Sequence, residues 1–277
     1  MKALITGASS GIGRDIAKEL SKRGYDLVLV ARDLEKLNKV KSEIKNANIE
    51  IVGLDISTVE NCKELYKNYK DIDILVNNAG FGDCGYFIST NLEKEVQMIN
   101  TNIVAYHVLT KLYLKNMQEK NKGKILNVAS IAGFMPGPLM ATYYSTKAYV
   151  VRLSESIREE LRKEKSKVQI SILCPGPVNT NFNKVANVEF ALKGLSSQYV
   201  AKMLPIIWIV AMLVENFIVG KISFILVSKF SGESDGFNAK ILFNILFCVT
   251  GMSAIMTILG GMIGMRKIKL KTNCYIC

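Results

Sequence analysis

The sequence has a single histidine among its 277 residues, and this scarcity limits the sites that it can form. His107 falls inside a long helical pattern without a carboxylate or cysteine partner, which favours a packed or half-exposed helix residue over a ligand. The six cysteines show no framework spacing in the body of the chain, and no secretory signal peptide is evident. We therefore expect a reduced, cytoplasmic catalytic part, no N-terminal targeting segment and no metal site.

Acidic residues are too few to balance the basic ones, and the formal net charge is +12. Such a surplus raises nucleic acid as a partner, but the lysines alternate with acids along helical stretches such as 33–46, which is typical of a solvated face. No aromatic-and-basic RNA motif or helix-turn-helix pattern is evident, so we expect no nucleic-acid partner. The anionic cytoplasmic surface of a membrane is the better partner for RKIKLK at 266–271.

Short β-branched runs alternate with amphipathic helical runs through the first 174 residues. Because the expected strands are apolar throughout and separated by helices, they indicate a parallel sheet that helices cover on both faces. The expected strands are 2–6, 26–31, 49–54, 72–77, 123–129 and 168–174, and the expected helices are 11–23, 33–46, 58–69, 91–120 and 142–165. The pattern predicts a doubly wound, Rossmann-type α/β domain over residues 1–200, with its ligand at the carboxyl ends of the strands.

The segment TGASSGIG, residues 6–13, follows the first strand and opens the first helix. Its glycines permit a tight turn and a close approach of the backbone to a pyrophosphate, and the helix amino terminus adds free N–H groups and positive potential. A plain strand-to-helix turn is the alternative, so the prediction of a dinucleotide site depends on the motifs that follow. The candidate contacts are Gly7, Ser9, Ser10, Gly11, Ile12 and Gly13.

The tip of the second strand reads LVARD and bears on the choice of cofactor. An acid at the strand end would hydrogen-bond the ribose hydroxyls and repel a 2′-phosphate, but Ala31 takes that place and Arg32 follows. A small residue with a guanidinium accommodates the phosphate, which favours NADP(H) over NAD(H). In the alternative, Arg32 is a solvated residue at a helix start and Asp33 binds the ribose.

Further motifs follow the glycine loop in a fixed order. They are Asp55 after the third strand, NNAG at 77–80, NTN at 100–102, Ser130 after the fifth strand, YYSTK at 143–147 and PGPVNTNF at 175–182. With these marks the chain resembles the classical short-chain dehydrogenase/reductase family over residues 1 to about 182. The LVAR and YYSTKAYV segments are most similar to NADP-using oxidoreductases of that family.

The YYSTK segment offers two adjacent tyrosines, and spacing decides between them. The family pattern is a serine, twelve residues, a tyrosine, three residues and a lysine, which Ser130, Tyr143 and Lys147 match, whereas Tyr144 comes one residue late. Residues four apart on a helix share a face, so the Lys147 ammonium can lie beneath the Tyr143 ring. Because a neighbouring cation favours the phenolate, we expect the pKa of Tyr143 to move from about 10 toward the working pH, as general acid–base catalysis requires.

The resemblance also implies roles for the neighbouring residues. Ser130 would hydrogen-bond the substrate oxygen, and Asn102 would anchor a water that links Lys147 to solvent. Alone, each residue has a plainer interpretation: aromatic packing for Tyr143, a turn cap for Ser130, a tie at a helix bend for Asn102 and a solvated helix residue for Lys147. Together, on a sheet that carries a nucleotide loop, the four indicate catalysis.

Further cofactor contacts follow from the resemblance alone. Asn78, Ala79 and Gly80 would line the adenine-ribose side, and Asp55 belongs to the same cofactor-binding set. The residues Pro175, Gly176, Val178 and Thr180 would wrap the nicotinamide end, with backbone groups of Val178 near the carboxamide. The alternative for this last group is a simple turn after the sixth strand.

Residues 201–277 depart from the family pattern and hold the apolar excess of the chain. The stretch 203–220 is interrupted by one proline, one glutamate and one asparagine, whereas 241–265 contains no charge in 25 residues. As a helix the second stretch would be roughly 37 Å long, which is enough for a bilayer core of ~30 Å. If both stretches span, the catalytic domain and the basic run both stay cytoplasmic.

Alternatives for this region stay open. The stretch 241–265 could lie in the membrane interface or pack on a partner subunit, with 203–220 a buried helix of the family. Residues 196–203 resemble the family's last helix, and 219–227 resemble its last strand. The final CYIC fits a prenylation box in form, but cysteine is atypical as its last residue, and an unmodified tail is the preferred interpretation.

The combined features predict an NAD(P)H-dependent oxidoreductase that interconverts a carbonyl and an alcohol. The C-terminal region predicts that it is held at a membrane, facing the cytoplasm, and acts on a lipid-like substrate. One alternative is a non-catalytic membrane module that senses NADP(H) or scaffolds a partner, against which the intact Ser130, Tyr143, Lys147 and Asn102 argue. Another is a soluble, homo-oligomeric cytoplasmic reductase of small carbonyl compounds.

Overall fold

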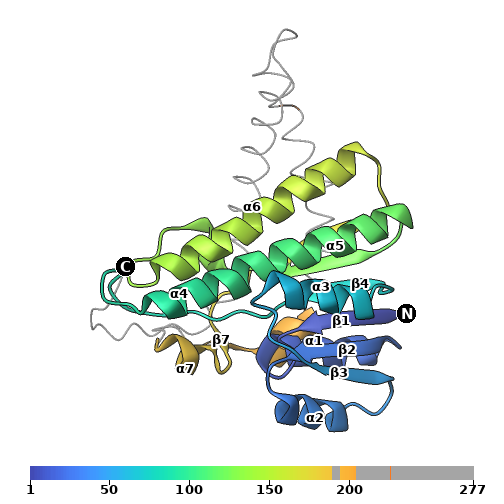
Figure 1. Cartoon of the computed structure of the whole chain (residues 1–277), viewed down its shortest axis with the longest axis horizontal. Helices are drawn as coiled ribbons and strands as arrows, with labels where there is room; N and C mark the ends of the chain where they lie inside the picture. Colours follow the sequence, from blue (N-terminus) through green and yellow to red (C-terminus); the bar gives the residue numbers. More distant parts are fainter. Residues whose placement is uncertain (189–193, 204–224, 226–277) are drawn as a thin grey trace. The chain divides into compact units, whose positions relative to one another are not determined.

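A computed structural model describes residues 1–188, 194–203 and 225 (Figure 1). The chain divides into two compact units, Met1–Lys202 and Met203–Cys277. Apart from Met203 and Ile225, the second unit lies outside the described residues, and with it the candidate spans 203–220 and 241–265, the expected strand 219–227, the basic run and the CYIC terminus. Within the described residues, no helix combines the length and the apolarity that crossing a bilayer requires.

The first unit is built on one six-stranded parallel sheet of order β3-β2-β1-β4-β5-β6. Its strands are β1 (Lys2–Thr6), β2 (Asp26–Ala31), β3 (Ile49–Gly53), β4 (Ile74–Asn77), β5 (Lys124–Val128) and β6 (Gln169–Leu173). The order reverses between β1 and β4, where Ile5 pairs with Val76, so the carboxyl ends of these two strands open a crevice. The predicted Rossmann-type α/β domain is confirmed.

Helices cover the sheet because its strands are apolar on both sides. Leu4, Leu75 and Ile125 pack with α3 (Val59–Asn68) and α5 (Ala105–Glu119) in the largest core cluster. Three further helices are α1 (Gly11–Ser21), α2 (Leu34–Glu43) and α6 (Ala141–Lys163). Side-chain caps fix two of the starts, since Asp33 accepts from the Lys36 N–H before α2 and Thr58 from the Asn61 N–H before α3.

The helix expected over 91–120 is interrupted, which is the main departure from the predicted elements. It consists of α4 (Leu92–Ile99), a π-helical turn at Asn100–Val104 and α5. A π-turn inserts an extra residue into the helical repeat, a feature frequent at functional sites. The turn contains Asn102, whose side chain is fully buried. Both α4 and the turn pack against α6 (Figure 1).

After β6 the chain forms two short strands with a short helix between them. A short strand, β7 (Val178–Asn179), pairs in parallel with β8 (Leu195–Ser196), and α7 (Phe182–Ala186) lies between them in the sequence. A helix then begins at Ser197, as expected. The Ser197 hydroxyl donates to Asp15 Oδ2 on α1, and Arg14 Nε pairs with the other oxygen of Asp15 at 2.9 Å. The bond from Ser197 ties the segment after α7 to α1, the helix that follows the glycine loop.

Candidate active site

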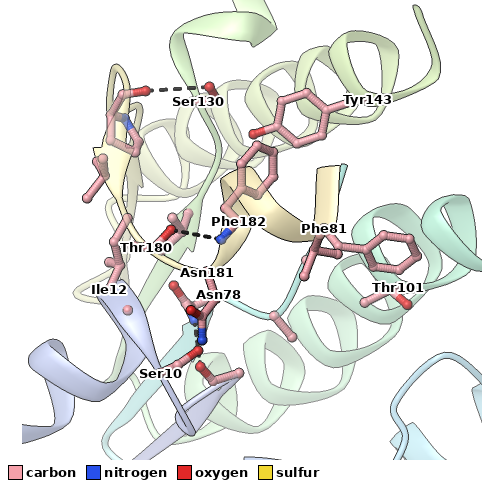
Figure 2. Close-up of a pocket in the computed structure, with 18 of the residues that line it drawn as sticks. Ser10, Ile12, Asn78, Phe81, Thr101, Ser130, Tyr143, Thr180, Asn181 and Phe182 are labelled. Atoms are coloured by element: carbon pink, nitrogen blue, oxygen red, sulfur yellow. Dashed lines mark hydrogen bonds between the residues drawn. The ribbon is translucent and has the colours of Figure 1, made fainter. Parts of the chain in front are cut away.

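A cavity of about 520 Å³ lies at the carboxyl ends of the strands. It brings together all the sequence-predicted site residues except Gly13 and Asn102. These are Gly7, Ser9, Ser10, Gly11, Ile12, Arg32, Asp55, Asn78, Ala79, Gly80, Ser130, Tyr143, Lys147, Pro175, Gly176, Val178 and Thr180. Figure 2 shows the glycine-loop residues at one end and Tyr143 with Ser130 at the other. The cavity therefore joins the two predicted halves of the site.

The glycine loop has the shape of a phosphate cradle. Gly7 and Gly11 adopt φ values of +64° and +55°, which side chains rarely tolerate. A Cβ on Gly7 would come within 2.7 Å of Ala79 Cα, and one on Gly13 within 2.5 Å of the Gly7 carbonyl oxygen. Gly13 thus acts by close packing and does not line the cavity. The loop fits a dinucleotide pyrophosphate at the amino terminus of α1.

Asn78 holds this loop in place as well as lining the cavity. Its Nδ2 donates to the carbonyl oxygens of Thr6 (3.0 Å) and Gly7 (3.1 Å). In return, Thr6 Oγ1 accepts from the backbone N–H groups of Asn78 and Ala79. The NNAG segment therefore fixes the glycine loop against β4, a role that the motif alone does not indicate.

The tip of β2 presents cations to the cavity. Arg32 is exposed and lines the cavity, and so does Lys36, which the sequence prediction missed. The Asp33 carboxylate accepts from the Lys36 backbone N–H at 3.0 Å and pairs with Lys36 Nζ at 2.7 Å. The hydrogen bond with the Lys36 side chain lowers the pKa of Asp33. Because its carboxylate is engaged at the start of α2, Asp33 is less available to a ribose than a free acid would be.

Tyr143 and Lys147 are buried on one face of α6. The Tyr143 side chain is 8% exposed and Lys147 is 4% exposed. Lys147 Nζ donates to the Val128 carbonyl oxygen at 3.0 Å and lies 5.8 Å from the centre of the Tyr143 ring. Ser130 Oγ accepts from the Ala132 N–H at 3.2 Å, and the Ser130 and Tyr143 hydroxyls lie on the same side of the pocket (Figure 2). The arrangement places two hydroxyls where a carbonyl oxygen could bind.

The pKa expected for Tyr143 is wrong in direction. Burial raises the pKa of Tyr143 to about 12, although a hydrogen bond from Ser130 opposes the rise. Burial also lowers the pKa of Lys147 to about 8, so the ammonium itself is poorly solvated. Helical spacing indicates the attraction between the cation and the phenolate, but the desolvation of both groups dominates in this protein.

Asn102 lies behind the cavity and not in its wall. Its Oδ1 accepts from the Phe81 N–H at 3.2 Å, and its Nδ2 donates to the Phe81 carbonyl oxygen at 2.9 Å and to Thr146 Oγ1 at 3.0 Å. The side chain therefore joins the π-turn, the segment after β4 and α6. A Cβ on Gly80 would lie 2.9 Å from Asn102 Oδ1 and 3.5 Å from Lys147 Nζ, so Gly80 keeps these groups close. The water-anchoring role of Asn102 stays a prediction.

The apolar wall beside Tyr143 was missed by sequence reasoning. It includes Phe81, Met140, Tyr144 and Phe182, and the Phe182 ring centre lies 5.1 Å from that of Tyr143 (Figure 2). Phe81 directly follows NNAG and Phe182 ends PGPVNTNF, so their proximity to motifs was the available signal. Thr101, Asn181, Asn183 and Val185 also line the cavity. His107 is exposed, and its Nδ1 is 2.8 Å from the Tyr149 hydroxyl.

A comparison with known protein families establishes which family the chain belongs to. A family model described as short chain dehydrogenase matches residues 1–189. The chain belongs to the short-chain dehydrogenase family. It is 34% identical over 204 residues to human 17-beta-hydroxysteroid dehydrogenase type 3, and 35% identical over 201 residues to the very-long-chain 3-oxoacyl-CoA reductase of Anas platyrhynchos. These matches cover 69% and 68% of this chain but 63% of each relative, less than two thirds of its length.

A solved relative agrees with this family membership. The crystal structure of a metagenomic short-chain oxidoreductase in complex with NADP is 28% identical to this chain, with a TM-score of 0.62. The match covers 75% of this chain and 90% of the relative. The family model thus matches most of the first unit, whereas all of residues 203–277 lies beyond it.

Proposed function

We propose that this short-chain dehydrogenase is an NADP(H)-dependent oxidoreductase that interconverts a carbonyl and an alcohol. The observation that carries the proposal is a single cavity that holds the glycine loop at one end and Ser130, Tyr143 and Lys147 at the other. A sensing or scaffolding module would not require a buried lysine beside a buried tyrosine, an arrangement that costs folding free energy.

The residues fit a nicotinamide dinucleotide, which when bound supplies the hydride. The glycine loop would hold the pyrophosphate, Arg32 and Lys36 a 2′-phosphate, and Asp55, Asn78, Ala79 and Gly80 the adenosine side. The segment from Pro175 to Thr180 would enclose the nicotinamide end. NADP(H) is favoured over NAD(H) because Arg32 is free to pair with a phosphate while Asp33 is engaged by Lys36.

Tyr143 would exchange the proton with the substrate oxygen. With a pKa of about 12, its hydroxyl is protonated at neutral pH, so Tyr143 is ready to donate a proton during carbonyl reduction. Ser130 would donate a second hydrogen bond to the same oxygen, and the Lys147 ammonium would stabilise the phenolate that forms. In this protonation state Tyr143 can act as the acid of carbonyl reduction, whereas alcohol oxidation first requires its deprotonation.

The substrate would be lipid-like. Supporting this, the wall beside Tyr143 is apolar, and the two relatives are named for a hydroxysteroid and a very-long-chain acyl group. Exposed apolar residues also gather in the segments after β4 and β5, where the Gly85 N–H donates to the Leu139 carbonyl oxygen at 2.8 Å. They are Tyr86, Phe87, Ile88, Phe134 and Met135. Such patches are typical of interaction sites.

Attachment to a membrane through residues 203–277 belongs to the same proposal, with the catalytic unit on the cytoplasmic side. The support is the uncharged stretch 241–265 and the basic run after it. An alkaline carbonate wash of membranes should leave the full chain in the pellet and release a chain that ends near Ser231. Release of the full chain by the wash would favour a soluble, homo-oligomeric reductase instead.

The Tyr143→Phe substitution tests the chemistry, with Tyr144→Phe as the matched control. NADPH oxidation should be followed with a panel of ketones and aldehydes that ranges from short to long acyl chains. We expect Tyr143→Phe to lose at least ~100-fold in kcat while NADPH still binds, because the proton donor is removed and the cradle is intact. Full activity in Tyr143→Phe would refute the assignment.

A further inference from the structure

A buried tyrosine, Tyr106, lies next to Lys147 without belonging to the residues that line the cavity. Its side chain is 1% exposed, and Lys147 Nζ lies over its ring, 5.4 Å from the ring centre. The Tyr106 hydroxyl and Lys147 Nζ also donate to the same acceptor, the Val128 carbonyl oxygen, at 3.1 Å and 3.0 Å. Tyr106 therefore meets the ammonium both through its ring and through a shared hydrogen-bond acceptor.

The π-turn sets the direction of this ring. Tyr106 is the second residue of α5 and comes directly after the turn at Asn100–Val104. One inserted residue rotates the chain that follows by roughly 100°, since an α-helix has about 3.6 residues per turn. The start of α5 therefore faces β5 and α6 differently from an uninterrupted continuation of α4. The turn that buries Asn102 thus also brings the Tyr106 ring to Lys147.

The surroundings of Lys147 hold little that offsets its charge. Its side chain is 4% exposed, and among the described residues no carboxylate pairs with it. The titratable groups that face it are Tyr106 from α5, Tyr143 from its own helix and Cys174 after β6. All three are neutral near pH 7, because burial raises the pKa of Tyr143 to about 12, the pKa of Cys174 to about 11 and the pKa of Tyr106 as well.

Aromatic rings can stabilise a cation under these conditions. A ring face attracts a cation within about 6 Å of its centre, and the attraction is stronger where water is excluded. Tyr106 meets this condition at 5.4 Å, and Tyr143 meets it at 5.8 Å. Tyr143 changes its protonation state in the proposed reaction, whereas Tyr106 takes no part in the proton exchange. Of the two rings, Tyr106 is therefore the one that can hold the ammonium throughout the reaction.

We propose that Tyr106 is a positioning residue, which holds the Lys147 ammonium in place and keeps it charged through the face of its ring. The role rests on the proposed function, in which Lys147 stabilises the Tyr143 phenolate. Tyr106 acts through Lys147 and not on the substrate. The ring carries the effect and the hydroxyl does not, because the Val128 carbonyl oxygen still accepts from Lys147 when the hydroxyl is absent.

Three substitutions in the full chain separate the ring from the hydroxyl and from the core. Tyr106→Leu removes the ring, and Tyr106→Phe keeps the ring but removes the hydroxyl. The matched control is Tyr113→Leu, because Tyr113 is also a fully buried tyrosine of α5. Its hydroxyl donates to the Tyr69 carbonyl oxygen at 2.9 Å, and its ring packs on Tyr66.

Each of these proteins, and wild type, is made with and without Lys147→Met. Urea unfolding of every pair is then measured from about pH 6 to about pH 11. The stability difference within a pair isolates the contribution of Lys147, because the core change and the other titrating groups are common to both members. This measurement needs no turnover. Where a substrate is found, the pH profile of kcat/KM at saturating NADPH is measured in parallel.

The expected result is a shift in the pH at which the Lys147→Met advantage begins to shrink. In wild type this pH is about 8, since above it the folded protein releases the Lys147 proton while the unfolded chain, with the ordinary pKa of 10.5, retains it. Losing the ring lowers the pKa of Lys147 by about one unit, so in Tyr106→Leu the advantage should begin to shrink about one pH unit lower. The alkaline limb of kcat/KM should move in the same direction. Tyr106→Phe and Tyr113→Leu should keep the wild-type onset.

Several results overturn the proposal. They are an equal onset in wild type and Tyr106→Leu, the lack of any onset in wild type, and a shift in Tyr106→Phe as large as in Tyr106→Leu, since the hydroxyl then carries the effect. An equal shift in Tyr113→Leu also overturns it, because a loosened core is then the cause. If Tyr106→Leu does not fold, Tyr106→Met replaces it under the same criteria, as a flexible apolar side chain without a ring. If wild type reduces none of a broad carbonyl panel, the proposed reaction fails, while the unfolding data still decide whether Tyr106 holds the charge of Lys147.

Discussion

Replacing Lys147 by methionine should stabilise the protein and abolish its activity. Burial lowers the pKa of Lys147 from an ordinary 10.5 to about 8. At about 1.4 kcal/mol per pKa unit, keeping this ammonium charged at neutral pH costs about 3 kcal/mol. Methionine fills a similar volume without the charge, and the Tyr106 hydroxyl still donates to the Val128 carbonyl oxygen that Lys147 contacts. Allowing ~1 kcal/mol for the lost hydrogen bond leaves a gain of ~2 kcal/mol.

The pH dependence of this gain identifies its cause. Below pH 8 both the folded and the unfolded protein carry the Lys147 proton, and the cost is fully present. Between about 8 and 10.5 the unfolded chain binds more protons than the folded one, so wild-type stability rises with pH and the advantage of Lys147→Met shrinks.

Thermal melts of the full chain measure the effect directly. For a unit of this size ~2 kcal/mol corresponds to an increase in Tm of roughly 4–8 °C at pH 7. The difference should decline toward pH 10.5, and Lys111→Met, at an exposed position on α5, should change Tm little at either pH. The reasoning is refuted if Lys147→Met has a lower Tm than wild type at pH 7, or if the Tm difference between the two does not change with pH. Either result would show that another group offsets the free-energy cost of the buried Lys147 ammonium.

Three other predictions concern the proton, the phosphate and the loop. Because the pKa of Tyr143 is about 12, the rate of alcohol oxidation should rise up to tenfold per pH unit from pH 7. The rate of carbonyl reduction should change little up to pH 8. An oxidation rate that is already independent of pH near neutrality would contradict this. Arg32→Ala should weaken NADPH about tenfold and NADH less than twofold in fluorescence titrations, and equal effects would reject the phosphate contact. Gly13→Ala should abolish cofactor binding because its Cβ meets the Gly7 carbonyl oxygen. The control is Gly24→Ala, at φ +78° with open space around it. This variant should bind the cofactor normally and lose only ~1 kcal/mol of stability.

The parallel sheet and the helices that cover it were predictable because each has its own signal. Apolar strands such as β4 and amphipathic helices such as α3 alternate without ambiguity, and the caps at Asp33 and Thr58 lie where the helical periodicity begins. The π-turn was not predictable, because one extra residue in the repeat between α4 and α5 changes the hydrophobic period too little to detect. Its consequence, the burial of Asn102, therefore needed the structure.

Motif residues could be identified from spacing, but their energetics could not. The three residues identified by spacing, Ser130, Tyr143 and Lys147, line one cavity. The same spacing nevertheless predicted the wrong direction for the pKa of Tyr143. Spacing reports which groups are neighbours, whereas desolvation depends on everything that surrounds them.

The buried face of α6 departs from an apolar pattern at two of the residues that the motifs single out. Tyr143, Lys147, Val150, Val151 and Ser154 all lie on the buried side of this helix, where a purely structural helix would carry apolar side chains throughout. A lysine at such a position reduces stability, and Ser154 needs its bond from Asn127 at 2.8 Å to be tolerated. Sequences that break the apolar pattern at a stability cost do so mainly at functional sites. If Lys147→Met is more stable but inactive, the break in pattern is explained by catalysis; if it is more stable and fully active, the lysine has no catalytic role and the proposed mechanism fails.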